Sequence, residues 1–184
     1  DRAAEALPTW EALVERKEAG TSLTRPELCV LLSYAKMDLM ARILESELPD
    51  DEAAATYLLD YFPAAAQAEA GEANLGGHRL RREIVASQLT NDLVDLMGST
   101  FVNRVARDTG RQRWEVARAW LVAARLAGHR SILDELAGRR RELSADVTYR
   151  WLRGLSRVLS RTTRWILANV DPERSTSEVV SENL

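Results

Sequence analysis

Apolar residues along this chain recur at spacings of three and four positions, and no segment alternates apolar with polar residues as a strand does. Such spacing is typical of helices that bury one face. Proline, glycine and capping residues separate the apolar segments from one another. The pattern predicts an all-α, multi-helix bundle with helices over 8–19, 24–48, 51–62, 78–97, 100–107, 114–127, 129–137 and 144–169.

Local signals mark several helix ends. Thr24 and Glu27 have the spacing of a capping box, in which each residue satisfies a backbone N–H group of the other. Gly98 follows the last apolar residue of its helix, where a glycine commonly ends the helical turn. A loop is expected over 71–77, which contains three glycines.

The domain organisation follows from the same segments. Residues 1–170 are expected to form a single helical domain. The segment 171–184 begins with Asp171-Pro172 and is mostly polar, so it is expected to be a disordered tail. The chain starts at Asp1 rather than at Met, which indicates a fragment of a larger protein.

Helical wheels collect the polar residues of helix 24–48 on one strip, and most of its other positions are apolar. We therefore expect this helix to be mostly buried. Lys36 lies away from the polar strip, close to Leu32 and Met40. The strip consists of Glu27, Tyr34, Asp38, Arg42 and Glu45.

The two other long helices differ in pattern. Helix 78–97 is apolar on two sides, with Asn91 at the centre of one side, so it is expected to pack as the central helix between layers. Helix 144–169 is the long C-terminal amphipathic helix. Its apolar face contains Trp151, Leu155, Val158, Leu159, Trp165 and Ile166, and its opposite face contains Arg150, Arg153, Arg157, Arg161 and Arg164.

Composition excludes several classes of function. The chain has 184 residues, 46% of them hydrophobic and 29% charged, and a net charge of −3, which argues against a general binder of nucleic acid or of anionic membranes. A single cysteine, Cys29, excludes an internal disulfide, and His78 and His129 lack the spacing of metal ligands. No apolar run is long enough to span a bilayer. A cytoplasmic location is expected, with no metal, membrane or nucleic-acid partner.

Two polar residues on apolar faces are candidates for chemistry. A buried Lys36 would have a lowered pKa and could act as a base or nucleophile. The preferred interpretation is a lysine that reaches solvent at a seam between helices, or that pairs with Glu83, Asp92 or Asp95. Asn91 could bind a ligand, although an amide there more often bonds a neighbouring helix and fixes its register.

Two clusters of positive charge are the remaining candidates. His78, Arg79 and Arg82 stand at a helix start, where the helix dipole is also positive, so an acidic partner or an anion is conceivable; a solvated first turn is preferred. The arginine face of helix 144–169 could contact phosphates. A solvated face, or one that docks on an acidic surface of another domain or subunit, fits the acidic chain better.

No motif for catalysis or cofactor binding is present. The sequence lacks a Gly-x-Gly-x-x-Gly loop, a Walker-type loop and a Gly-x-Ser-x-Gly elbow. From the residues alone, this is an all-α bundle without a recognisable active site.

Three stretches nevertheless resemble a known family. In order and spacing, the chain from Gly20 to Ala127 is similar to the C-terminal region of the large, bacterial-type NAD-specific glutamate dehydrogenases, and a late Arg164-Trp165 motif is similar as well. The matching stretches are Leu23–Leu28 with Val30–Lys36, His78–Ile84 with Gln88-Leu89 and Asn91–Val94, and Gly98–Phe101 with Val116–Ala119.

The resemblance implies a parent enzyme that deaminates L-glutamate oxidatively to 2-oxoglutarate and ammonia while reducing NAD. In that family the catalytic core lies upstream, so this segment would carry no catalytic, cofactor-binding or metal-binding residue. A structural, inter-domain or oligomerisation role is implied, with other domains or subunits as partners, because the family works as homo-oligomers. The alternative is an effector-binding helical module, with Lys36, Asn91 and the 78–82 cluster around a pocket.

Overall fold

A computed structural model describes residues 8–183, without the side chains of Glu72 and Ala73. The all-α prediction is confirmed, since this part of the chain contains helices and turns and no strand. The elements are α1 (Trp10–Glu18), α2 (Arg25–Leu44), η1 (Leu48–Asp50), η2 (Glu52–Ala54), α3 (Thr56–Tyr61), α4 (Ala64–Gly76), α5 (Arg81–Met97), α6 (Phe101–Thr109), α7 (Arg113–Leu126), α8 (His129–Gly138), α9 (Ala145–Asn169) and α10 (Thr176–Ser181).

The helix ends follow the capping residues. Thr24 Oγ1 accepts a hydrogen bond from the Glu27 backbone N–H at 3.4 Å, and the Glu27 carboxylate accepts from the Thr24 N–H at 2.9 Å. The capping box at the start of α2 is therefore confirmed. Ser144 caps α9, and Gly98 ends α5 with a φ of 82°, which an L side chain rarely adopts.

Helix α7 is the centre of the fold. It packs against α9, α6 and α2, and Trp120 near its middle is fully buried. Helix α5 does pack between other elements, with α2 on one side and α3 on another. The helix with the most continuous burial is nevertheless α7, whose buried residues are Val116, Ala117, Ala119, Trp120, Leu121, Val122, Ala123 and Ala124.

The loop expected over 71–77 is largely helical. Helix α4 continues to Gly76, and only Gly71, with a φ of 73°, departs from helical geometry inside it. The prediction weighted the glycines too heavily, because a glycine with positive φ can kink a helical segment without ending it.

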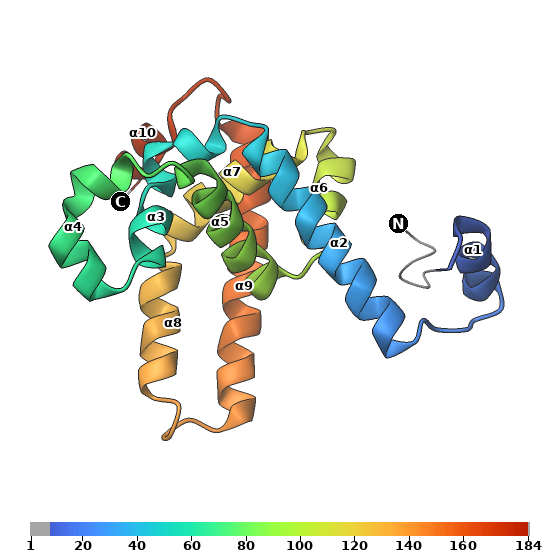
Figure 1. Ribbon diagram of the computed structural model, residues 1–184. Coiled ribbons are helices and arrows are strands. Elements are labelled where there is room, and N and C mark those ends of the chain that lie inside the picture. Colours follow the sequence, from blue (N-terminus) through green and yellow to red (C-terminus); the bar gives the residue numbers. More distant parts are fainter. Residues whose placement is uncertain (1–7, 184) are drawn as a thin grey trace.

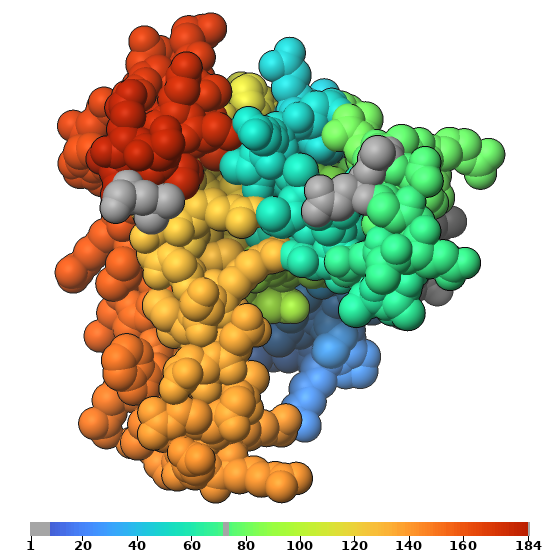
Figure 2. Space-filling model, turned by 90° about the vertical axis from the view of Figure 1, so that its left-hand side faces the viewer, coloured from blue at the N-terminus to red at the C-terminus, as the bar shows by residue number. Residues whose placement is uncertain are grey.

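Residues 171–183, where the sequence predicts a disordered tail, include helix α10. Ser175 caps α10, Val179 is buried, and Figure 2 shows the segment seated at the end of the molecule away from the α8–α9 turn. Arg118 holds the segment by donating to Pro172 O at 2.9 Å and also to Arg174 O. The segment is mostly polar, so its sequence did not indicate that a few of its side chains are buried against the body.

The expectation that helix 24–48 is mostly buried is wrong. Helix α2 extends beyond the body of the molecule, and α1 lies beside its free end (Figure 1). Only Leu39 and Ile43 in α2 are buried, both in its C-terminal half. We call its N-terminal part, residues 25–37, the α2 overhang.

The apolar face expected for helix 144–169 is only partly buried. Leu155, Leu159 and Ile166 face the core, together with Thr163. The remaining three members, Trp151, Val158 and Trp165, are exposed. The part of α9 nearest the α8–α9 turn projects from the body alongside α8, so it has fewer neighbours to cover it (Figure 1).

Candidate binding site at the seam of α2 and α5

Lys36 and Asn91 meet in one pocket between α2 and α5. The pocket has a volume of about 230 Å³. Helix α2 supplies Lys36 from the base of the overhang, and α5 supplies Asn91 from one turn beyond Ser87. The full lining is Ser33, Lys36, Met37, Met40, Ser87, Thr90 and Asn91.

Lys36 is half-buried at this seam. Among the described residues it has no ion pair, so none of the expected partners holds it. Asp92, one of those partners, instead faces the other side of α5, where it binds Tyr57 and His129. Asn91, also half-buried, forms no hydrogen bond through its side chain within the same described part of the chain.

The apolar stripe of α2 runs past the edge of the body. Ile43 and Leu39 are 0% and 5% exposed where α2 packs on α5. Leu32 and Leu28 continue the same stripe toward the N-terminus but are 41% and 45% exposed. These four positions are spaced by four or seven residues, so they share one face of the helix. A face that is built for packing is therefore covered at one end only.

The cluster at 78–82 does not join the pocket. Arg82 donates to Leu44 O and Ser46 O at 2.8 Å each, which satisfies carbonyl groups left free at the end of α2. Its guanidinium also pairs with Asp50. The His78 ring accepts from the Leu80 N–H at 3.2 Å, and Arg79 is exposed. Arg82 thus closes the α2–η1 corner and is not available to a ligand of the pocket.

The arginines of α9 have different surroundings. Arg150 pairs with Asp146 at 2.8 Å, and Arg164 pairs with Asp108 at 3.0 Å. Arg161 is exposed. Arg153 and Arg157 line a hollow of about 540 Å³ between α5, α8 and α9. Its other lining residues are Asp92, Asp95, Leu96, Leu133, Tyr149, Leu152 and Ser156.

A buried polar network links three helices, and the sequence analysis missed it. Tyr57 Oη of α3 donates to Asp92 Oδ2 at 2.6 Å, and His129 Nε2 of α8 lies 2.9 Å from the same oxygen. His129 Nδ1 lies 3.0 Å from Ala124 O, so both ring nitrogens have a polar neighbour. The partners are 35 and 37 residues apart, and no local pattern signals such a pairing.

Burial and the nearby Asp92 carboxylate both raise the pKa of Tyr57. Ionising this phenol would place a second negative charge beside Asp92, on a side chain that is only 3% exposed. The Arg130 guanidinium lies 4.4 Å from the centre of the Tyr57 ring and opposes the shift only in part. Tyr57 is therefore held as a neutral hydrogen-bond donor.

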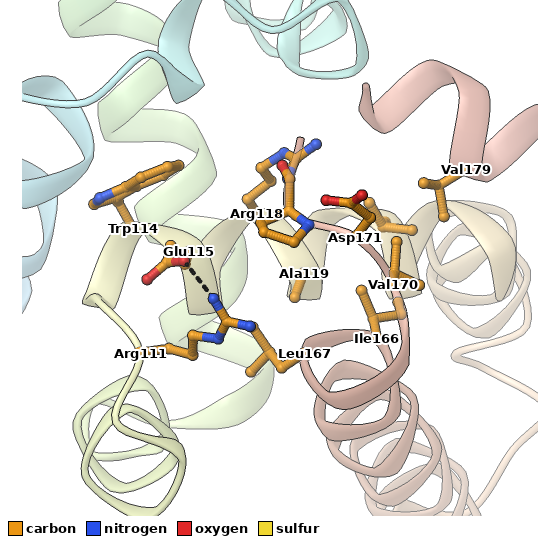
Figure 3. A pocket seen from close by; sticks show the side chains of 12 residues that line it. Arg111, Trp114, Glu115, Arg118, Ala119, Ile166, Leu167, Val170, Asp171 and Val179 are labelled. Atoms are coloured by element: carbon orange, nitrogen blue, oxygen red, sulfur yellow. Dashed lines mark hydrogen bonds and ion pairs between the residues drawn. The ribbon is translucent and has the colours of Figure 1, made fainter. Parts of the chain in front are cut away.

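The hollow between α7, α9 and α10 is too small and too well satisfied to be a ligand site. Its volume is about 50 Å³, less than a quarter of that of the pocket between α2 and α5. Figure 3 shows Arg118 beside Asp171 and the pair of Arg111 with Glu115, whose charged atoms are 3.3 Å apart. The hydrogen bonds of Arg118 are used to hold the C-terminal segment.

Within residues 8–183, His, Cys, Asp and Glu side chains form no group of three or more that could hold a metal ion. No helix in the same part of the chain combines the length and apolar content needed to cross a bilayer.

The fold and the site define a class of protein, an all-α helical domain. Its helix α2 is partly uncovered, and a pocket that contains Lys36 and Asn91 lies at the base of the α2 overhang. The family model described as glutamate dehydrogenase, C-terminal, matches residues 20–182. The chain belongs to this family.

Relatives of this chain are NAD-specific glutamate dehydrogenases. Identity is 40% to the protein of Pseudomonas aeruginosa, 38% to that of Halomonas elongata and 35% to that of Mycobacterium tuberculosis. Each match covers 91% of this chain but only 10% of the relative. The chain therefore spans about a tenth of the length of the curated relatives it matches.

Proposed function

We propose that this chain is the C-terminal, non-catalytic helical domain of an NAD-specific glutamate dehydrogenase. The parent enzyme would convert L-glutamate and NAD to 2-oxoglutarate, ammonia and NADH, with glutamate and NAD bound outside this segment. The family match and the names of the relatives support this assignment. The purified chain should form no NADH from glutamate, and appreciable turnover by the chain alone would refute the non-catalytic role.

The role that we propose for the domain is docking onto another part of the same parent polypeptide through the α2 overhang. One observation carries this proposal, namely that the stripe buried at Leu39 and Ile43 continues uncovered at Leu32 and Leu28. Relatives have about nine-tenths of their length outside the matched segment, and this length is available to supply a covering segment. Fully burying a leucine side chain contributes about 1.5–3 kcal/mol, and covering the exposed half of two leucines would contribute about that much in total.

The docking role can be tested with a double variant, Leu28→Ser with Leu32→Ser, made in the isolated chain and in the full-length enzyme. The isolated chain should keep its thermal midpoint, because both side chains already contact water. The full-length enzyme should lose thermal stability and glutamate-dependent NADH formation. Leu80→Ser is the matched control, since Leu80 is 46% exposed but lies outside α2. Unchanged stability and kinetics of the full-length double variant would refute the docking role.

Homo-oligomeric assembly and a cytoplasmic location of the parent are also part of this proposal. The hollow between α5, α8 and α9, with Arg153 and Arg157 at its rim, is the surface that we assign to contacts between subunits. Light scattering of the full-length enzyme with Arg153→Glu and Arg157→Glu should show a smaller assembly than the unchanged enzyme. Arg161→Glu on the same helix is the control. An unaltered mass in the double variant would remove this surface from the proposal.

A further inference from the structure

The pocket between α2 and α5 has the size for a small ligand group. Its volume, about 230 Å³, is several times the roughly 30 Å³ that one water molecule occupies in the liquid. It also falls below the range of about 300–1,000 Å³ that is usual for drug-sized ligands.

The lining offers hydrogen-bond donors with one positive charge, together with the acceptor oxygens of the Asn91 amide and the Ser87 hydroxyl. The Ser33 hydroxyl donates to Cys29 O at 2.9 Å, and the Thr90 hydroxyl donates to Ala86 O at 2.7 Å, so both hydroxyl protons are committed to their own helices. The Lys36 ammonium offers three N–H donors and the Asn91 amide offers two. Neither has a partner among the side chains and backbone atoms that the structure describes.

The charge of Lys36 is not balanced from within the pocket, which has no carboxylate in its lining. Asp38, two residues after Lys36, pairs with Arg42 and Arg113. Asp92, one residue after Asn91, is occupied by the buried network. Asp38 and Asp92 are therefore engaged with other groups.

We propose that this pocket binds a carboxylate group. One oxygen would accept from Lys36 Nζ and the other from Asn91 Nδ2, while the methylene next to the carboxylate packs against Met37 and Met40. A singly charged anion suits a site with a single cation, whereas phosphate sites usually use arginine forks or rows of backbone N–H groups. The flexible thioethers of methionine adapt to aliphatic groups of different shape.

The carboxylate can come from two sources. It can belong to a free small organic acid, or to an Asp or Glu side chain of a segment that covers the α2 overhang. The chemistry in the pocket is the same in both cases. The proposal of a carboxylate site rests on Lys36 and Asn91, so it does not depend on the docking role proposed above.

The chain is well suited to a direct test because Lys36 and Lys17 are its only lysines. With ¹³Cε-labelled lysine, the chain gives two side-chain signals, and Lys36→Met assigns them. Sodium acetate is titrated against sodium chloride at equal ionic strength. The Lys36 signal should move and saturate with acetate alone. Lys17, on exposed α1, should respond equally to both salts.

The Asn91→Leu variant provides the second measurement. Removing the amide should weaken acetate binding about tenfold, since a hydrogen bond to a charged group is lost. Circular dichroism and the thermal midpoint confirm that the variant is folded. A Lys36 signal that follows acetate and chloride equally would overturn the proposal, and so would unchanged acetate affinity in a folded Asn91→Leu variant.

The source of the carboxylate is then distinguished in the full-length protein. An amine-reactive ester labels the lysines, and mass spectrometry gives the labelling rate of Lys36 relative to that of Lys17. Protection of Lys36 that requires added acetate supports a free acid. Protection without acetate, lost in the Leu28→Ser, Leu32→Ser variant, supports a tethered side chain. Absence of protection under both conditions contradicts the site in the assembled protein.

Discussion

The Tyr57–Asp92–His129 network supports a quantitative prediction for the variant Asp92→Ala. Asp92 Oδ2 accepts from Tyr57 Oη at 2.6 Å and contacts His129 Nε2 at 2.9 Å. Truncation removes this acceptor and leaves a phenol and an imidazole without their partner. Tyr57 and His129 are 3% and 2% exposed, so solvent does not replace the lost contacts freely.

The magnitude follows from the two donors. An unsatisfied buried donor costs about 1–3 kcal/mol, so two would cost about 2–6 kcal/mol. The Asp92 side chain is itself 20% exposed, and water can enter the space that it leaves. We therefore expect a loss of about 2–4 kcal/mol in the free energy of unfolding. For a chain of this length, this corresponds to a fall of roughly 5–15 °C in the thermal midpoint.

Urea denaturation followed by circular dichroism measures the loss, with thermal unfolding as a second measure. The matched control is Asp95→Ala, an exposed carboxylate about one turn further along α5, for which a change within about 0.5 kcal/mol is expected. The reasoning would be refuted by a loss below about 1 kcal/mol in Asp92→Ala, or by an equal loss in Asp95→Ala.

Three further predictions concern pH and packing. Because the pKa of Tyr57 is raised, its contribution to stability is complete below pH 10.0, the ordinary pKa of tyrosine, and fades at higher pH. Absorbance titration should show that one of the four tyrosines ionises only on unfolding. The Tyr57→Phe variant should lack that step. The Thr24 N–H and the Arg16 guanidinium hold the pKa of Glu27 below its usual 4.5, so stability should fall as pH drops below 4.5. Glu27→Gln should lower the thermal midpoint, and by more at pH 7 than at pH 3. Val179 is buried, so Val179→Ala should lower the free energy of unfolding by about 2 kcal/mol, as measured by urea denaturation. A change near zero would contradict the packing of α10 on α7.

Helix positions could be read from the sequence because their signals are local. The capping box of Thr24 with Glu27 involves two residues three positions apart, and Gly98 acts on its own helix alone. Each signal is complete within about one turn, so it needs no knowledge of the fold. The same locality explains the error at 71–77, where the glycines signalled a break that the rest of α4 tolerates.

The candidate site could be anticipated only in part. The wheels singled out Lys36 and Asn91 as polar residues on apolar faces, and the structure places both in one pocket. They could not show that Arg82 is used to close the end of α2. The buried network also stayed hidden, because Asp92 on its wheel is merely one polar residue among several.

The sequence by itself determined that the chain is all-α, where most helices begin and end, and, through three ordered motifs, which family it resembles. Tertiary structure alone decided which apolar faces are covered. Leu28 and Leu32 share the periodicity of Leu39 and Ile43, and Trp151 and Trp165 that of Leu155, yet only the inner members of each set are buried. Periodicity reports that a face can pack, since it is a property of one helix. Whether that face is buried depends on which other helices lie against it, and at the α2 overhang Leu28 and Leu32 stay 45% and 41% exposed.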